Sequence, residues 1–285
     1  MTDPWDNRDY LRGTQYKTDA NLAARQSIYA YQHPRIDLQA RVLDLAGPAR
    51  SDTIVDVGCG NGSYLAALAR RGFGGRVLGV DLSLGMLTAA RQRLNGVGQA
   101  GAAGATNGST EPDDSTKPGV PLVALANADA TALPLPDGVA DLALAPHMLY
   151  HVPAPAEALR ELRRVTRPGG RVVLVLNGAG HLRQLRMAVA AARGDDVRAQ
   201  RERVTLDDGE SMARDFFPNV TRHDFVAELR VPSPAPIADY LRSMAGTSHH
   251  GVPGHVIETV VAALPRSPEG HYVITSHAGC LIAES

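Results

Sequence analysis

The chain has 285 residues, of which 44% are hydrophobic and 21% charged, values typical of globular proteins with a substantial core, and they exclude global disorder. Its 29 basic and 30 acidic residues leave a formal net charge of -1. This charge provides no overall field to hold a polyanion, so nucleic acid is not expected as a partner.

Cysteine content and hydropathy favour a cytoplasmic protein. The two cysteines do not make a disulfide framework, residues 1–31 lack the apolar run of a signal peptide, and no apolar run approaches the roughly 20 residues that span a bilayer. We therefore expect a soluble chain without a membrane partner, either a monomer or a homodimer.

The first predicted elements are two helices, at residues 18–31 and 35–46. They are separated at His33-Pro34 and end at Gly47-Pro48, because proline disfavours helix in the preceding residue and glycine ends helices. We expect residues 1–48 to form an N-terminal helical lid.

From residue 53 onward, short β-branched apolar runs alternate with longer amphipathic stretches, the pattern of βα units around a mostly parallel sheet. The pattern predicts an α/β, Rossmann-like, doubly wound fold over residues 49–285. The expected strands are 53–57, 76–80, 120–126, 139–145 and 171–176, and the expected helices between them are 62–71, 84–94 and 155–165.

Residues 96–119 contain almost no large apolar side chain, so we expect a flexible surface insertion there. Residues 178–270 are expected to include a substrate-side cover. The elements predicted after residue 177 are a helix near 181–193, a strand at 222–231, helices at 237–244 and 256–264, and a final antiparallel strand at 272–282.

A glycine loop follows the first core strand, in the sequence Val-Asp-Val-Gly-Cys-Gly-Asn-Gly that ends at Gly62. Glycine is needed where the backbone turns with positive φ and where a ligand approaches the main chain. Asp81 ends the second strand, where it can accept hydrogen bonds from the two hydroxyls of a ribose. The loop therefore indicates a nucleoside ligand.

Three details favour a cationic nucleoside over a dinucleotide. The glycines are spaced Gly-x-Gly-x-Gly rather than Gly-x-Gly-x-x-Gly. Asp56 precedes them, and its carboxylate repels a pyrophosphate but suits an ammonium and a sulfonium group. Asp129 follows the third strand, where an adenine amino group can donate to it. A short-chain reductase would also need a Tyr-x-x-x-Lys pair in the core, which neither lysine supplies.

The loop, together with Val-Asp-Leu-Ser at 80–83, Asp-Ala-Thr-Ala-Leu-Pro at 129–134 and the segments 147–152 and 159–170, resembles the class I S-adenosylmethionine (SAM) dependent methyltransferases. The resemblance is to their small-molecule, type 11 group and extends over about residues 50–178. It implies that SAM is the cofactor and S-adenosylhomocysteine (SAH) the product.

The resemblance also implies which residues hold SAM. Asp56, Gly58 and Gly60 surround its methionine part, and Asp81 binds the ribose. The adenine and the remaining contacts are assigned to Leu82, Met86, Asp129, Ala130, Cys59, Asn61, Pro146 and, from the lid, Tyr16. For Met86 the alternative is ordinary core packing, and for Asp129 it is a turn before Leu133-Pro134.

Two histidines are candidates for the transfer step. His147 follows the fourth strand, at the sheet edge where α/β proteins bind substrates, and His151 lies four residues on, so a helical turn would place both imidazoles on one face. Either is a candidate general base near neutral pH. The alternative for His151 is a structural hydrogen bond in the loop.

Two distal features carry weaker signals. His249, His250 and His255 lack the further ligands of a zinc site, so we expect no metal. The segment 181–203 holds six arginines and three acids, which indicates a solvated helix face or a contact with an anionic acceptor or RNA.

The sequence thus predicts a SAM-dependent methyltransferase that modifies an oxygen or nitrogen of a small organic acceptor, such as a secondary metabolite. The alternatives are an RNA methyltransferase, which the neutral charge opposes, and a non-catalytic SAM-binding protein, which an intact loop does not exclude.

Overall fold

The computed structural model describes residues 20–103, 122–195, 204–243, 252 and 254–285. Within them, one sheet has the strand order β1-β7-β8-β6-β5-β2-β3-β4. Strands β2 to β6 are parallel to their neighbours among themselves, whereas β8 is antiparallel to both β6 and β7, and β1 is antiparallel to β7. The strands are β1 (Gln32–His33), β2 (Thr53–Val57), β3 (Arg76–Asp81), β4 (Leu122–Asn127), β5 (Ala140–Pro146), β6 (Thr166–Asn177), β7 (Asn219–Val231) and β8 (Tyr272–Glu284).

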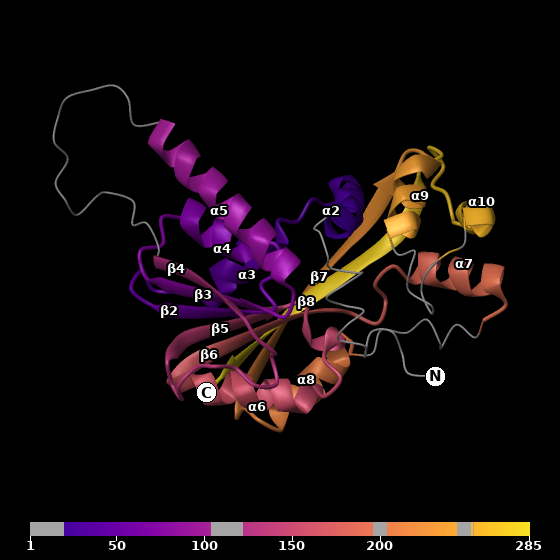
Figure 1. Ribbon diagram of the computed structural model, residues 1–285. Helices are drawn as coiled ribbons and strands as arrows, with labels where there is room; N and C mark the ends of the chain where they lie inside the picture. The colour runs from indigo at the N-terminus through magenta and orange to yellow at the C-terminus, as the bar shows by residue number, and fades with distance from the viewer. Residues whose placement is uncertain (1–19, 104–121, 196–203, 244–251, 253) are drawn as a thin grey trace.

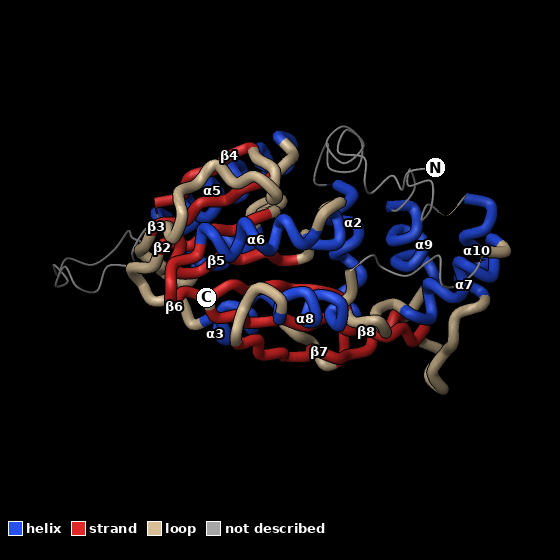
Figure 2. The backbone as a smooth tube through the Cα atoms, turned by 90° about the horizontal axis from the view of Figure 1, so that it is seen from below, coloured by secondary structure: helices blue, strands red, loops and turns tan. Residues whose placement is uncertain are grey.

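Helices cover both faces of this sheet, as Figures 1 and 2 show. Helices α3 (Leu38–Ala46), α4 (Ser63–Arg70) and α5 (Leu84–Ala103) lie on one face, and α6 (Pro155–Val165) and α8 (Leu206–Arg214) on the other. The buried side chains follow the same division, because one apolar cluster contains α3 and α4 residues and a second contains α6 and α8 residues. The predicted Rossmann-like, doubly wound α/β fold with an antiparallel C-terminal strand is confirmed.

Strands β7 and β8 are 13 residues long and extend past the rest of the sheet. The end of β6, Asn177, pairs with Ala278, so the preceding part of β8 lies beyond the carboxyl edge of the parallel strands, where it pairs with β7 alone. A third apolar cluster packs on this extension, and Figure 1 shows its helices gathered there. These elements are the 3-10 turn η3 (Ile28–Tyr31), α7 (Arg183–Arg193), α9 (Pro234–Ser243) and α10 (Ile257–Ala262), and α2 (Ala20–Ser27) packs next to α9.

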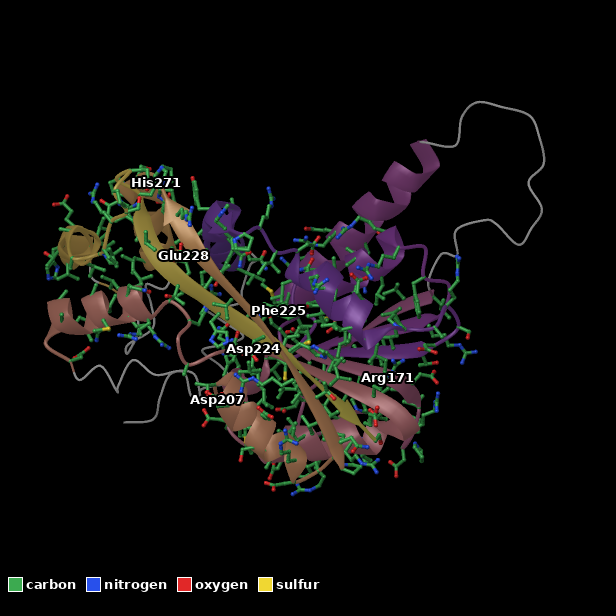
Figure 3. All side chains as sticks on the ribbon, turned by 180° about the vertical axis from the view of Figure 1, so that it is seen from behind. Arg171, Asp207, Asp224, Phe225, Glu228 and His271 are labelled. Atoms are coloured by element: carbon green, nitrogen blue, oxygen red, sulfur yellow. The ribbon has the colours of Figure 1, made fainter. Side chains whose placement is uncertain are left out.

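Charged side chains gather along β7, which β1 covers at only two residues, so that most of β7 forms the edge of the sheet. Arg222 forms ion pairs with Asp207 of α8 at 2.6 Å and with Asp224 at 2.7 Å, and Asp224 also pairs with His277 of β8 at 2.7 Å. Figure 3 shows Asp207, Asp224 and Phe225 in this region. Charged side chains along an edge strand discourage pairing with another chain.

Two elements differ from the sequence-based expectation. Helix α5 continues to Ala103, so the first part of the expected insertion 96–119 is helical, because alanine and glutamine at 99–103 favour helix despite the glycines. The rest of that insertion, from residue 104, lies outside the described residues. Helix α8 was not predicted, although Thr205 and Asp208 form a capping box at its start.

The described part of the chain lacks two kinds of feature. None of the helices there has the length and apolar content required to cross a membrane. No three His, Cys, Asp or Glu side chains in this part of the chain gather as a metal site would require. Of the distal histidines, His255 lies in the 3-10 turn η6 (Gly254–Val256), while His249 and His250 lie outside the described residues.

Candidate functional site

A cavity of about 650 Å³ lies at the carboxyl edge of the parallel strands. Its inner part is lined by the loops after β2, β3, β4 and β5, and its outer part by η3, α7 and α9. The predicted site residues that line it are Gly58, Cys59, Gly60, Asn61, Asp81, Leu82, Met86, Asp129, Ala130, Pro146, His147 and His151. Asp56 does not line it, and Tyr16 lies outside the described residues.

The glycine loop has a left-handed backbone, which favours glycine, at each of its three glycines, and two of them differ in what surrounds them. At Gly58, with φ of 70°, an added Cβ would lie 2.5 Å from the Cβ of Met148. At Gly60, with φ of 54°, nothing lies within 4 Å of that site, so this backbone faces open space in the cavity wall. The loop therefore presents bare main chain to a ligand.

Asp81 holds this loop in place. Its two carboxylate oxygens accept hydrogen bonds from the backbone N–H groups of Gly60 and Ser83, each at 2.8 Å. Burial raises the pKa of Asp81, and these two hydrogen bonds oppose that rise. The carboxylate thus ties the glycine loop to the end of β3.

Asp56 lies behind the loop rather than on the cavity wall. It is fully buried, and neither of its carboxylate oxygens has a hydrogen-bond partner among the described residues. The same holds for Nδ2 of Asn61 and the hydroxyl of Tyr64, both of which do line the cavity. Burial, followed by repulsion from Asp81, raises the pKa of Asp56 to about 8.

Met86 and Asp129 each show the ordinary structural role that the sequence left open, and both also line the cavity. Met86 is 2% exposed, so it belongs mainly to the core, and it also touches the cavity. Asp129 accepts hydrogen bonds from the backbone N–H and the hydroxyl of Thr131, at 2.9 and 2.8 Å, so it shapes a turn at the cavity wall.

Cys59 lines the cavity as a neutral thiol, because burial and the nearby acids Asp56 and Asp81 raise its pKa. This agrees with a packing role in the loop rather than a nucleophilic one.

His147 has a strained backbone. Its φ of 54° is unusual for a residue with a side chain, and its N–H donates to the carbonyl of Val175 at 2.8 Å. Burial lowers the pKa of His147 to about 4, so the imidazole is neutral at physiological pH. Strain of this kind at a cavity wall points to a functional constraint.

His151 does not share a helical turn with His147, contrary to the expectation. The turn is the 3-10 segment η4 (Leu149–His151), which begins after His147 because His147 itself is left-handed. The Tyr150 ring lies between them, with its centroid 4.5 Å from that of His151 and 6.5 Å from that of His147. The three rings form one wall of the cavity.

A second polar pair lines the cavity, and the sequence analysis did not single out its histidine, His181. The hydroxyl of Tyr29 lies 2.9 Å from Nε2 of His181, and the two rings stack with centroids 6.1 Å apart. His181 lies four residues after the end of β6, whereas His147 lies one residue after the end of β5, so the place of His181 near the carboxyl edge of the sheet was available as a weaker signal. Both residues line the outer part of the cavity.

Comparison with known proteins identifies the domain. Residues 55–174 match a family model described as "Methyltransferase domain". The chain is 35% identical over 127 residues, 45% of its length, to demethylmenaquinone methyltransferase from Clavibacter sepedonicus. It is 32% identical over 166 residues, 58% of its length, to trans-aconitate 2-methyltransferase from Methylobacterium nodulans.

The solved structure of YcgJ from Bacillus subtilis superposes with a TM-score of 0.57 at 16% identity, over 87% of this chain and 97% of that one. This likeness confirms the fold. Residues 55–174 belong to this methyltransferase domain family.

The methyltransferase domain covers only part of each relative. The chain spans 42% of the demethylmenaquinone enzyme and 47% of the trans-aconitate enzyme. In this chain, the family match includes the glycine loop, Asp81, Asp129 and the two histidines, but it ends before Asn177 and so excludes the outer part of the cavity.

The buried Asp56 predicts a pH dependence of stability. The folded protein keeps a proton on Asp56 up to about pH 8, whereas the group ordinarily loses it near 3.8, so between these values the folded state binds more protons and the free energy of unfolding falls as pH rises. From pH 6.5 to 8 we expect the ligand-free wild type to lose on the order of 1 kcal/mol relative to the Asp56→Asn variant.

Urea unfolding of both proteins at a series of pH values measures this difference. Because the comparison stays above pH 6.5, the titration of His147 and His181 in the folded state does not enter it. Parallel stability curves would mean that Asp56 is already ionised in the folded protein.

Proposed function

We propose that the chain binds SAM in the inner part of the cavity and transfers its methyl group to an oxygen or nitrogen of a small organic acceptor. The observation that carries this proposal is the backbone of Gly60 at the cavity wall. Its N–H donates to Asp81 at the end of β3, and nothing lies within 4 Å of the place that a Cβ would occupy. When bound, SAM supplies a methyl group on a positively charged sulfur, which a nucleophile displaces directly.

The unsatisfied polar atoms behind the loop support a cationic ligand. Asp56, Asn61 and Tyr64 bring a carboxylate, an amide and a hydroxyl together, all buried and without a partner among the described residues. Buried polar groups are costly unless they are paired. The Tyr64 hydroxyl can accept a hydrogen bond from an ammonium group, and Nδ2 of Asn61 can donate to a carboxylate, so the amino-acid end of SAM would pair both, whereas a pyrophosphate brings no positive charge to the two aspartates.

The nucleoside part has a matching set of groups. Each oxygen of Asp81 accepts one backbone N–H and retains a lone pair for a ribose hydroxyl. Leu82 and Met86 supply apolar contact for an adenine, and Asp129 and Ala130 lie where its amino group would point. Asn127 steadies this wall, since its side-chain amide donates to the carbonyls of Asp81 and Leu82 at 2.9 and 2.8 Å.

His147 is our candidate for the residue that receives the acceptor. Its neutral imidazole can accept a hydrogen bond from a hydroxyl or an amine, and it can take the proton as that atom is methylated. A pKa near 4 makes it a weak base, so orientation of the acceptor is its larger contribution. His151 and Tyr150 complete the same wall.

Several further features support a small acceptor. The two curated relatives are named for methylation of demethylmenaquinone and of trans-aconitate, both small molecules. The outer side of the cavity is lined by η3, α7 and α9, and its volume of about 650 Å³ is in the range of small-molecule sites. We propose a cytoplasmic enzyme, a secondary metabolite as acceptor, residues 1–48 as a lid and residues 178–270 as the acceptor-side cover.

Replacing Asp81 with alanine is expected to weaken SAM binding at least ~10-fold, because it removes charge-assisted hydrogen bonds to the ribose and the anchor of the glycine loop. Calorimetric titration with SAM measures the change. The control is Asp44→Ala, which removes an exposed partner of Arg71 on α3. Unchanged SAM affinity in Asp81→Ala would remove Asp81 from the site.

The His147→Ala variant tests the transfer step. With an acceptor that the wild type methylates, we expect kcat to fall by roughly 10²-fold while the Kd for SAM stays within a factor of about two. Mass-spectrometric detection of SAH gives the rate, and His271→Ala, a histidine at the far end of the β7–β8 extension (Figure 3), is the control. Equal turnover would refute the role of His147, and SAM binding without SAH formation by the wild type would indicate a non-catalytic protein.

A further inference from the structure

The outer part of the cavity, beyond His147, is formed by residues that the family match does not cover. We call it the outer chamber and define it by Leu22, Arg25, Tyr29, His181, Leu185 and Arg186. These residues come from α2 and η3 on one side and from the start of α7 on the other. Their chemistry bears on the class of acceptor.

Charge is segregated along the cavity. The Asp, Glu, Lys and Arg side chains among its described lining residues are Asp37, Asp81, Asp129, Arg25 and Arg186. The three acids belong to the inner part: Asp81 and Asp129 follow β3 and β4, and Asp37 acts electrostatically on Tyr64 next to the glycine loop. Both arginines belong to the outer chamber, so the cavity is acidic where SAM is proposed to bind and basic beyond it.

The Tyr29–His181 pair has a defined proton arrangement. Nδ1 of His181 accepts a hydrogen bond from the backbone N–H of His277 at 3.2 Å, so in the neutral ring the proton lies on Nε2 and is donated to the Tyr29 oxygen. Tyr29 therefore directs its own hydroxyl proton away from His181, as a donor. Burial, with repulsion from His147, Arg186 and His277, lowers the pKa of His181 to about 3, which keeps the ring neutral.

The backbone around Arg186 is firmly held. Leu182, which follows His181, has a φ of 49°, and its N–H donates to the carbonyl of Thr275 at 2.8 Å. The guanidinium of Arg186 donates to the carbonyl of Ala179. His147 and Leu182 are the non-glycine residues with positive φ in the described part of the chain, and both line this cavity. The backbone that carries Arg186 is therefore held in a fixed position at the cavity wall.

Arg25 lies one helical turn before Tyr29, so both residues face the chamber from the same side. Arg186 acts electrostatically on His181 and so lies near it. The Tyr29–His181 contact joins the two segments, so both guanidinium groups line the same chamber as this polar pair. Donors arranged in this way match an anionic oxygen group, because guanidinium groups bind carboxylates and phosphates through paired N–H donors.

We infer that the methyl acceptor is an organic anion whose carboxylate or phosphate is held in the outer chamber by Arg25 and Arg186, with the Tyr29 hydroxyl as a third donor. Leu22 and Leu185 line the same chamber, so the anion carries an apolar body. The inference rests on the proposed function, in that it takes the outer chamber as the acceptor site. For the arginine-rich segment 181–203, the sequence left open a solvated helix face, a contact with an anionic acceptor and a contact with RNA. This inference favours the anionic acceptor.

Calorimetry with four probes tests this inference on the SAH-saturated protein: benzoate, phenyl phosphate and their neutral counterparts benzamide and benzyl alcohol. We expect at least one anion to bind at least ~10-fold more tightly than its neutral counterpart. Binding by benzoate alone identifies a carboxylate site, and binding by phenyl phosphate alone identifies a phosphate site. No binding by either anion, or equal binding by the neutral probes, overturns the inference.

The variants Arg25→Gln and Arg186→Gln are expected to weaken the anion at least ~10-fold each and to leave SAH affinity unchanged. Arg183→Gln is the matched control, because Arg183 lies on the same helix, is exposed and does not line the cavity. Anion binding that neither variant changes overturns the inference. The two proposals are separated by titrating SAH and, in a second experiment, the anion into the ligand-free protein. Failure of SAH to bind, with arginine-dependent anion binding intact, would reject the proposed function alone.

Discussion

The two hydrogen bonds from the backbone of Gly60 and Ser83 to Asp81 are the constraint on which the candidate site depends. They fix the glycine loop against the end of β3 and keep the left-handed backbone at Gly60 open to the cavity. They also bring a second acid close to Asp81, because Asp56 lies buried behind the loop, where burial and then repulsion from Asp81 raise its pKa. A loop of this kind stays costly without a cation nearby, which is the physical reason for assigning it a sulfonium nucleoside rather than a diphosphate.

The second determinant is the length of β7 and β8. Because they continue past the carboxyl edge of the parallel strands, they carry an apolar cluster that joins Ile28 with residues of α7, α9 and α10. This cluster positions the outer chamber opposite the glycine loop. The cavity therefore has two ends of different origin, an acidic end from the methyltransferase domain and a basic end from the elements around it.

Periodicity and loop chemistry were enough to predict the fold and the place of the glycine loop, because alternating strands and helices leave a strong local pattern. Other features depend on tertiary structure. Whether Asp56 faces the cavity or the interior is decided by how β2 is placed in the sheet, and the left-handed backbone of His147 has no local sequence signal. Tyr29 and His181 are 152 residues apart, so their contact could not be inferred from either segment alone. Helix α8 had a readable start at Thr205, whereas the continuation of α5 through glycines did not.

The most direct test of this account is a pair of calorimetric titrations of the wild-type protein, one with SAM and one with NADH. Both ligands carry an adenosine, and they differ in the group that meets the acids at the glycine loop: a sulfonium with an ammonium in one, a pyrophosphate in the other. The account predicts saturable binding of SAM and no measurable heat from NADH. Binding of NADH without binding of SAM would contradict it.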